Sequence, residues 1–342
     1  MKIAVDAMGG DFAPGEIVKG AVTAVKTLSD IEVVLVGDET QIHDLLVTYG
    51  AADNPKLSIR HASEVIEMGE HPGQAIRKKK DASVVVATKL VRTKECDAVV
   101  APGSTGAAVA AALFGLGRIK GIDRPAIATP IPTLRGTTVM LDSGANANCK
   151  PKHLVQNAIM GYNYAKLMFG EENPSVGLLN IGEEATKGTE LVQAAYPMLQ
   201  HLKTIPFKGN VEGRDIPKGT VDVVVCDGFV GNVILKFGEG LVSAAVQIAK
   251  QAIKDTGWLA KLGALLLVPA LKKMKKGFDH KENGGAPLLG VNGVFLIAHG
   301  SSKEKEIVTA IKIASDLVER KIIDNIQKSI EAEGVIEDVD VE

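Results

Sequence analysis

Short aliphatic runs recur along this chain and alternate with longer segments of helical periodicity. The runs are rich in Val and Ile and break at Gly, Asp, Asn or His, which is typical of buried parallel strands. They lie at residues 2–7, 31–37, 97–103, 137–144, 174–182, 221–228 and 293–300. Amphipathic helical patterns occupy residues 15–28, 107–119, 153–168, 189–202 and 305–326. The alternation predicts an α/β fold, with a Rossmann-like, mostly parallel sheet covered by helices on both faces.

Most of these runs end in polar turns that contain glycine. In open parallel sheets the carboxyl ends of the strands border the ligand crevice, and glycine lets the backbone approach a ligand closely. We therefore predict that the turns share one substrate site. The alternative is ordinary turn and cap chemistry at each of them. The candidate binding residues in these turns are Asp6, Gly9, Gly10, Asp11, Gly103, Ser104, Thr105, Gly106, Asp142, Asn146, Asp227, Gly228, Gly300 and Ser301.

Composition narrows the class of protein. The 342 residues are 46% hydrophobic but only 4% aromatic, which predicts a globular protein with an aliphatic core. Because 39 basic residues face 41 acidic ones, the formal net charge of -2 gives no general field that would attract nucleic acid. Nucleic acid is therefore not expected as a partner.

The cysteines and the N-terminal residues predict a cytoplasmic location. Cys96, Cys149 and Cys226 are odd in number and lack metal-type spacing, which indicates reduced thiols and no zinc site. Asp6 interrupts the first apolar run too early for a signal peptide. No uninterrupted stretch reaches the roughly 20 apolar residues of a spanning helix.

Residues 103–106 form a Gly-Ser-Thr-Gly turn between a strand and a helix of small residues. Backbone N–H groups and hydroxyls at a helix N-terminus favour an anion such as phosphate. The turn at residues 299–302 repeats this pattern, while a plain Ser/Thr helix cap is the alternative. Neither a P-loop nor a G-x-G-x-x-G fingerprint occurs, which disfavours kinases and dinucleotide-dependent dehydrogenases.

Nine motifs in a fixed order carry a resemblance to a known family. They are "AVDAMGGDFAP", "GSTGA", "GRIKGIDRPA", "LDSGAN", "LLNIGEEATKG", "GNVEGRDI", "DGFVGNVILK", "GGAPLLGV" and "AHGSS". From residue 1 to about residue 320 the chain resembles the phosphate acyltransferases of bacterial phospholipid synthesis. The resemblance implies a fold like that of phosphotransacetylases and isocitrate dehydrogenases. We expect one catalytic domain over residues 1–330, and the acidic composition of residues 331–342 predicts a C-terminal tail.

The same resemblance implies the chemistry. A long-chain acyl group would pass from the thioester of acyl carrier protein to inorganic phosphate, without a cofactor or metal. The acyl phosphate would then serve a glycerol-3-phosphate acyltransferase. Attack by phosphate needs positioning and charge stabilisation more than a strong base.

Three residues are the catalytic candidates. Lys187 would neutralise phosphate or the oxyanion, Asn232 would donate an amide hydrogen bond, and His299 would protonate the leaving thiolate. Asn210, in the "GNVEGRDI" motif, joins the binding residues. A surface lysine, a helix-capping asparagine and a turn histidine are the structural alternatives. A thiol nucleophile at Cys149 is disfavoured.

A helical insertion at about residues 240–285 is expected to project and to handle the acyl chain. Its apolar core is followed by lysines, which suits contact with an anionic membrane or an acidic carrier protein. The candidates are Leu265, Leu266, Leu267, Lys272, Lys273, Lys275 and Lys276. A buried helix with a solvated lysine face is the alternative. Residues 77–80 form a second basic patch, and aliphatic helix faces such as residues 240–253 predict a homodimer.

Three competing functions stay open at this point. A short-chain phosphate acyltransferase using acyl-coenzyme A would share the reaction but would not need the apolar, lysine-edged segment. A metal-dependent hydroxy-acid dehydrogenase of the isocitrate type would use the strand-end aspartates as metal ligands. A membrane-associated scaffold would bind lipid phosphate without turnover.

Overall fold

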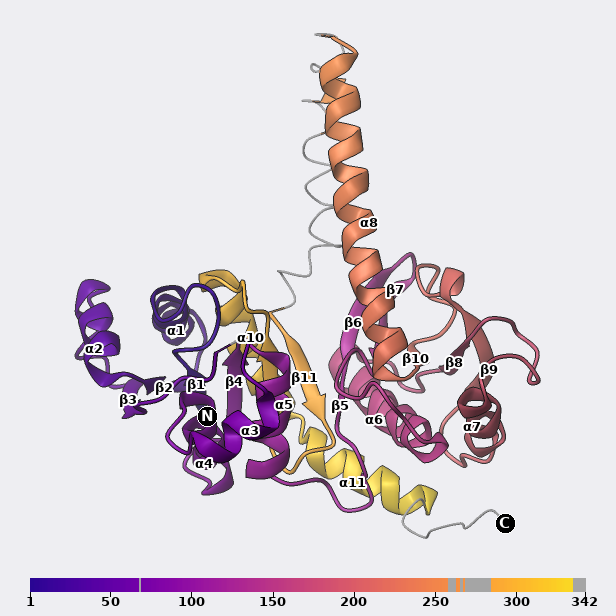
Figure 1. The fold of residues 1–342 in the computed structure, drawn as a ribbon, viewed down its shortest axis with the longest axis horizontal. Coiled ribbons are helices and arrows are strands. Elements are labelled where there is room, and N and C mark those ends of the chain that lie inside the picture. The colour runs from indigo at the N-terminus through magenta and orange to yellow at the C-terminus, as the bar shows by residue number, and fades with distance from the viewer. Residues whose placement is uncertain (68, 258–262, 265–266, 268–283, 335–342) are drawn as a thin grey trace.

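The predicted α/β class is confirmed, and the strands divide between two sheets (Figure 1). The structure is a computed structural model that describes residues 1–67, 69–257, 263–264, 267 and 284–334. Strands alternate with helices along most of the chain. The sheets lie side by side, and helix α8 projects away from both of them (Figure 1).

The larger sheet has seven strands in the order β3-β2-β1-β4-β12-β11-β5. Strands β3, β2, β1, β4 and β12 run parallel, while β11 and β5 are antiparallel to their neighbours. The strands are β1 (Lys2–Asp6), β2 (Glu32–Gly37), β3 (Leu57–His61), β4 (Ala98–Pro102), β5 (Ala126–Ile127), β11 (Ala286–Leu289) and β12 (Val294–Ala298). The carboxyl ends of β1, β4 and β12 therefore meet at one edge.

Helices cover both faces of this sheet, as the sequence predicts. Ile3 and Val5 pack in one hydrophobic cluster with α1 (Gly15–Thr27) and α10 (Glu304–Glu319). Ala4, on the opposite face, packs with α4 (Ser83–Arg92) and α5 (Thr105–Gly115). Two short helices complete this part of the chain: α2 (Glu39–Thr48) and α3 (Pro72–Lys78).

The smaller sheet has five strands in the order β6-β7-β10-β8-β9. They are β6 (Thr129–Thr133), β7 (Gly136–Leu141), β8 (Val176–Asn180), β9 (Phe207–Glu212) and β10 (Val223–Val225), and all pairings except β6–β7 are parallel. A 3-10 turn, η1 (Gly213–Asp215), follows β9. Helices α6 (Pro151–Phe169) and α7 (Glu190–Gln200) connect the strands. The terminal helix α11 (Ile322–Glu333) runs from the larger sheet to pack on α6 (Figure 1).

Helix α8 (Gly228–Asp255) begins earlier than the boundary near residue 240 that the sequence suggests. Its 28 residues span about 42 Å, and only Gly228 and Gly231 are buried. Its length and apolar composition would allow it to cross a membrane, and almost none of that stretch is buried. From the sequence, no uninterrupted apolar stretch of this length is expected, because charged residues such as Lys236 and Glu239 interrupt the run. Taken as a whole, the helix is nevertheless long and apolar enough.

Candidate functional site

Three predicted turns of the larger sheet come together. The Asp11 N–H donates to the Gly300 carbonyl at 2.7 Å, which joins the turn after β1 to the turn after β12. A Cβ on Gly9 would lie 2.1 Å from the Pro102 carbonyl oxygen, so only glycine lets the turn after β1 approach the end of β4. The polar turn at residues 6–11 therefore forms one side of the place where three strand ends meet.

These strand ends border a pocket of about 200 Å³, which we call the strand-end pocket. Both polar and apolar side chains line it. The lining residues are Asp6, Met8, Gly9, Gly10, Asp11, Val65, Ile66, Glu67, Ser83, Val84, Ala101, Pro102, Gly103, Ser104, Ala107 and Ala108. Three of them are carboxylates, and none is Lys, Arg or His. In the described part of the chain, no group of three or more His, Cys, Asp or Glu side chains is placed to hold a metal ion.

Burial sets the electrostatics of Asp6. The side chain is 4% exposed, and its Oδ1 accepts from the Met8 N–H at 3.1 Å. Burial raises the pKa of Asp6 from 3.8 to about 6, against the opposing effect of hydrogen bonds from Ser83, Met8 and Gly9. Above pH 6 the buried Asp6 carboxylate is ionised and is a strong hydrogen-bond acceptor for a donor group of a ligand.

Asp6→Asn is expected to make the free energy of unfolding less dependent on pH. Because the folded-state pKa of about 6 lies above 3.8, the folded protein binds the proton more tightly. As pH rises from about 3.8 to about 6, ionisation of Asp6 therefore lowers the free energy of unfolding by up to about 3 kcal/mol. Urea unfolding of wild type and variant between about pH 4 and pH 8 measures the difference. A constant gap would contradict the assignment, and Asp53→Asn on the surface is the control.

Other predicted residues of this group have structural partners. Ser104 caps α5, since its Oγ accepts from the Ala107 N–H at 3.4 Å, and Thr105 and Gly106 are exposed in the first turn. His299 is exposed and its Nδ1 lies 2.8 Å from the Ser301 Oγ, while the Ser301 N–H also points to Nδ1 at 3.2 Å. Ser104 therefore caps α5, and the roles of Ser104 and His299 toward substrate stay predictions.

A second group forms at the end of β7 in the smaller sheet. Asp142 is fully buried, and its Oδ1 accepts from the N–H groups of Ile127, Gly144 and Ala145 at 2.9–3.2 Å. Its Oδ2 accepts from the backbone and side-chain N–H groups of Asn146 at 2.7 and 2.9 Å. Burial raises the pKa of Asp142 even so. Its role is to fix this turn.

The turn at Asp142 joins the two sheets and positions the start of α8. Asn146 donates from Nδ2 to the Pro125 carbonyl, next to β5, and its own carbonyl accepts from the Gly228 N–H at 2.8 Å. Asp227 caps α8 by accepting from the Val230 N–H at 2.9 Å. Asn232, in the next turn of α8, is exposed and lies against Gly144.

Two buried asparagines hold the loop that carries Lys187. The Asn180 Nδ2 donates to the Lys187 carbonyl at 3.0 Å, and the Asn210 Nδ2 donates to the Glu184 carbonyl at 2.9 Å. Gly188 has a φ of +94°, and a Cβ there would lie 2.3 Å from the Asn180 Oδ1. The Lys187 side chain itself is exposed. Asn210 thus helps to fix the loop, and its direct contact with substrate stays a prediction.

Asn180→Ala is expected to lower kcat about tenfold, because the loop would no longer hold Lys187 in one position. The free energy of unfolding should fall by only about 1–2 kcal/mol for the lost hydrogen bonds. Steady-state kinetics and urea unfolding measure the two effects. Asn325→Ala, which also removes amide-to-carbonyl bonds, is the control far from this loop. An unchanged kcat in Asn180→Ala would contradict the positioning role.

The structure therefore gathers the predicted residues in two groups, one at each sheet. Asp6 to Asp11, Gly103 to Gly106 and His299 to Ser301 belong to the larger sheet. The group of the smaller sheet comprises Asp142, Asn146, Lys187, Asn210, Asp227, Gly228 and Asn232. Neither Lys187 nor Asn232 lines the strand-end pocket, so a cavity common to all of them stays a prediction.

The remaining candidates lie elsewhere or outside the described residues. Leu267 is 58% exposed, while Leu265, Leu266, Lys272, Lys273, Lys275 and Lys276 lie outside the described residues. The three cysteines are free thiols, and burial raises the pKa of Cys149 to about 11, which leaves little thiolate to act as a nucleophile.

Sequence reasoning missed three residues of the two groups. Ser83 and Glu67 line the pocket from segments distant in sequence, and Asn180 reads as the end of a strand. Gly188, directly after Lys187, was the signal that the sequence offered for a fixed loop, because glycine is favoured where the backbone needs a positive φ.

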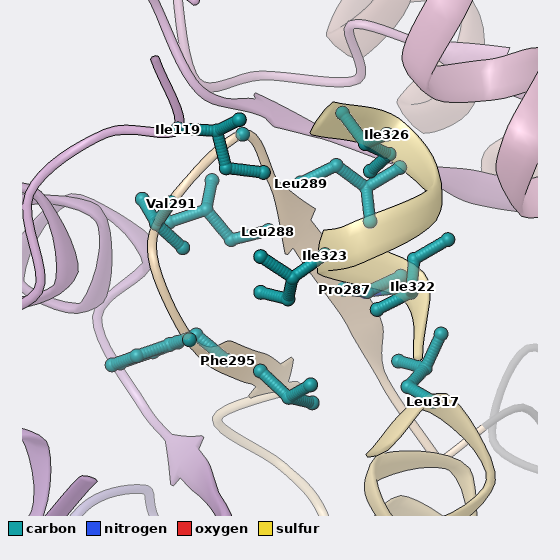
Figure 2. A pocket seen from close by; sticks show the side chains of 13 residues that line it. Ile119, Pro287, Leu288, Leu289, Val291, Phe295, Leu317, Ile322, Ile323 and Ile326 are labelled. Carbon is teal, nitrogen blue, oxygen red and sulfur yellow. The ribbon is translucent and has the colours of Figure 1, made fainter. Parts of the chain in front are cut away.

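A second pocket is only a packing gap. Figure 2 shows apolar side chains such as Ile119, Phe295 and Ile326 around it. Its volume is about 10 Å³, which is at most the space of one water molecule. The strand ends therefore remain the candidate site.

Solved structures share this fold. A phosphotransacetylase from Streptococcus pyogenes matches with a TM-score of 0.60 at 18% identity, covering 97% of this chain and 94% of that one. A phosphotransacetylase from Staphylococcus aureus also matches with a TM-score of 0.60, at 16% identity, covering 93% of this chain and 94% of that one. The chain therefore has the α/β fold of the phosphotransacetylases.

The sequence relatives give the family. The family model described as "Fatty acid synthesis protein" matches residues 1–325. Phosphate acyltransferases of Pelotomaculum thermopropionicum and Desulfitobacterium hafniense are each 56% identical over 332 residues. These alignments cover 97% and 96% of this chain and 96% and 98% of the relatives. The chain belongs to the phosphate acyltransferase family of fatty acid and phospholipid synthesis, and it is an acyltransferase.

Proposed function

We propose that this acyltransferase moves a long-chain acyl group from the thioester of acyl carrier protein to inorganic phosphate. The product, an acyl phosphate, would be consumed by a glycerol-3-phosphate acyltransferase in the cytoplasm. The observation that carries the proposal is the position of Lys187: an exposed ammonium on a loop that two buried asparagines fix at the end of β8. Family membership supplies the reaction class.

Phosphate is held at the ends of β8 and β10 in this proposal. The two strands are neighbours, so the loop of Lys187 and the start of α8 with Asn232 leave the sheet at the same edge. Lys187 supplies the positive charge, and the α8 N-terminus adds a favourable dipole.

The reaction needs few groups. A phosphate oxygen attacks the thioester carbonyl carbon, and the resulting oxyanion is stabilised by the Lys187 ammonium and the Asn232 amide. The carbon–sulfur bond then breaks, and the leaving thiolate takes a proton, for which His299 is the candidate donor. The turn at Asp142 ties the two groups of residues together through Ile127 and Pro125.

One assay tests the reaction. Purified protein is incubated with palmitoyl acyl carrier protein and labelled phosphate, and hydroxylamine-sensitive acyl phosphate is measured. Acyl phosphate made from the carrier protein supports the proposal. Product from short-chain acyl-coenzyme A alone would instead indicate a short-chain enzyme, lipid binding without turnover a scaffold, and nicotinamide reduction a dehydrogenase.

We also propose that α8 mediates a homodimer. Exposed apolar side chains recur along the helix, and such a surface needs a partner layer. They are Phe229, Val230, Val233, Phe237, Leu241, Val242, Val246 and Ile248. Peripheral contact with an anionic membrane, through the lysine-edged segment after α8, belongs to the same proposal.

Substitution of Phe237 and Leu241 by glutamate is expected to convert the dimer into a monomer, because each charge would be buried in an apolar interface. Light scattering coupled to size exclusion measures the mass. Gln247→Glu adds a charge at a polar position of the same helix and serves as the control. A wild-type protein that is monomeric at micromolar concentration would overturn the dimer proposal.

A further inference from the structure

We propose that the strand-end pocket binds the amide-bearing thiol arm of the acyl donor and not the phosphate. This inference rests on the proposed function, because it assigns the second substrate of the same reaction to its own subsite. It separates the two groups of predicted residues by role: the larger sheet holds the arm of the donor, and the smaller sheet holds the anion.

The charge of the pocket disfavours phosphate. Asp6, Asp11 and Glu67 line it, and no Lys, Arg or His does. A multiply charged anion would face like charges without a compensating cation. Two donors at the adjoining helix starts are also engaged: the Ser83 N–H donates to the Glu64 carbonyl, and the Ala107 N–H donates to the Ser104 Oγ.

The same lining suits a neutral chain that carries N–H and O–H donors. A pantetheine arm has two amide N–H groups and a hydroxyl, which can donate to carboxylates, and a dimethyl group that needs apolar contact. Asp6 offers a buried acceptor, and Met8, Val65 and Ile66 offer apolar surface. A fatty acyl chain would leave these carboxylates without partners, so the mixed lining favours the arm.

The surface beside the pocket has the opposite charge. Helix α3 follows Glu67 closely and packs on α5, where a Cβ on Gly106 would lie 2.7 Å from the Pro72 side chain. Arg77 and Lys78 are exposed on α3, and the Arg77 guanidinium lies 5.5 Å from the centre of the Phe114 ring. An acidic carrier protein could therefore rest on α3 while its neutral arm enters the acidic pocket.

Two substitutions in the pocket test the assignment, because they should change the KM for the acyl donor and leave the KM for phosphate nearly unchanged. Ala107→Leu fills the pocket, and Asp6→Asn removes its buried carboxylate. Each is expected to raise the KM for palmitoyl acyl carrier protein, about tenfold for Ala107→Leu and about threefold for Asp6→Asn, with the KM for phosphate within about twofold of wild type. Ala110→Leu, on the same helix but outside the lining, is the control.

The opposite pattern overturns the inference. A raised KM for phosphate with an unchanged KM for the donor would assign the pocket to the anion. An unchanged donor KM in both folded variants would remove the pocket from donor binding. If Ala107→Leu does not fold, as judged by circular dichroism, Asp6→Asn decides.

A binding measurement separates this inference from the proposed function. Pantetheine is titrated into the full-length protein in a calorimeter, without turnover. Binding to wild type that Ala107→Leu weakens at least about tenfold supports the pocket assignment even if the transfer assay fails. Equal binding to both proteins, or none to wild type, overturns it.

Discussion

Lys187→Ala is expected to lower kcat/KM for acyl phosphate formation by about 10²- to 10³-fold. The physical reason is the loss of the one positive charge that the proposal places at the oxyanion and the phosphate. The backbone of the loop should keep its position, because Asn180 and Asn210 hold it through carbonyl groups that the substitution leaves in place. Steady-state kinetics with both substrates varied gives the effect.

Two variants make this result specific to the charge at Lys187. Lys187→Arg keeps the charge and should retain more activity than Lys187→Ala, although its planar group would not reproduce the geometry of an ammonium. Lys312→Ala removes an exposed lysine from α10 and should behave like wild type. Near wild-type turnover in Lys187→Ala would remove Lys187 from the mechanism.

Asp142→Ala is expected to lower the free energy of unfolding by about 3–4 kcal/mol, the largest effect on stability that we predict. The substitution would leave the N–H groups of Ile127, Gly144, Ala145 and Asn146 without their acceptor in a buried place. Urea unfolding measures the loss.

Asp142→Ala should lower the free energy of unfolding by more than the loss of a helix cap does. Asp227→Ala removes the cap of α8 and should lower the free energy of unfolding by only about 1 kcal/mol. Equal losses in Asp142→Ala and Asp227→Ala would contradict the role of Asp142 as the joint between the sheets.

The class of fold and the strand ends could be predicted from local pattern. Val- and Ile-rich runs that end in Gly and Asp, such as residues 2–7 and 221–228, became parallel strands whose ends carry the candidate residues. The division into two sheets could not be predicted this way. It depends on the short strand β5 and on the proline-containing strand β6, and neither has a strong strand pattern.

Roles of individual residues were harder to predict because they depend on contacts distant in sequence. The hydrogen bond from the Asn210 Nδ2 to the Glu184 carbonyl could not be seen in the sequence, and substrate binding by Asn210 stays a prediction. Glu67 and Ser83 gave no local signal, although they help make the strand-end pocket acidic and polar. A projecting helical segment was predicted from about residue 240, whereas the projecting helix α8 begins at Gly228, a boundary that the sequence pattern did not mark (Figure 1).

The division of the site between anion and donor arm follows from charge. The larger sheet presents carboxylates around a pocket, whereas the smaller sheet presents Lys187 on a fixed loop and the start of α8. In our proposal, two substrates of different charge, phosphate and a neutral thiol arm, are bound at strand ends of different sheets.

A crystal structure of the protein soaked in phosphate, with arsenate as an anomalous marker for the anion, tests this division most directly. We predict an anion within about 3.5 Å of both the Lys187 Nζ and the Asn232 Nδ2, at the ends of β8 and β10. An anion seated among Asp6, Asp11 and Glu67, with Lys187 and Asn232 free of it, would contradict the account.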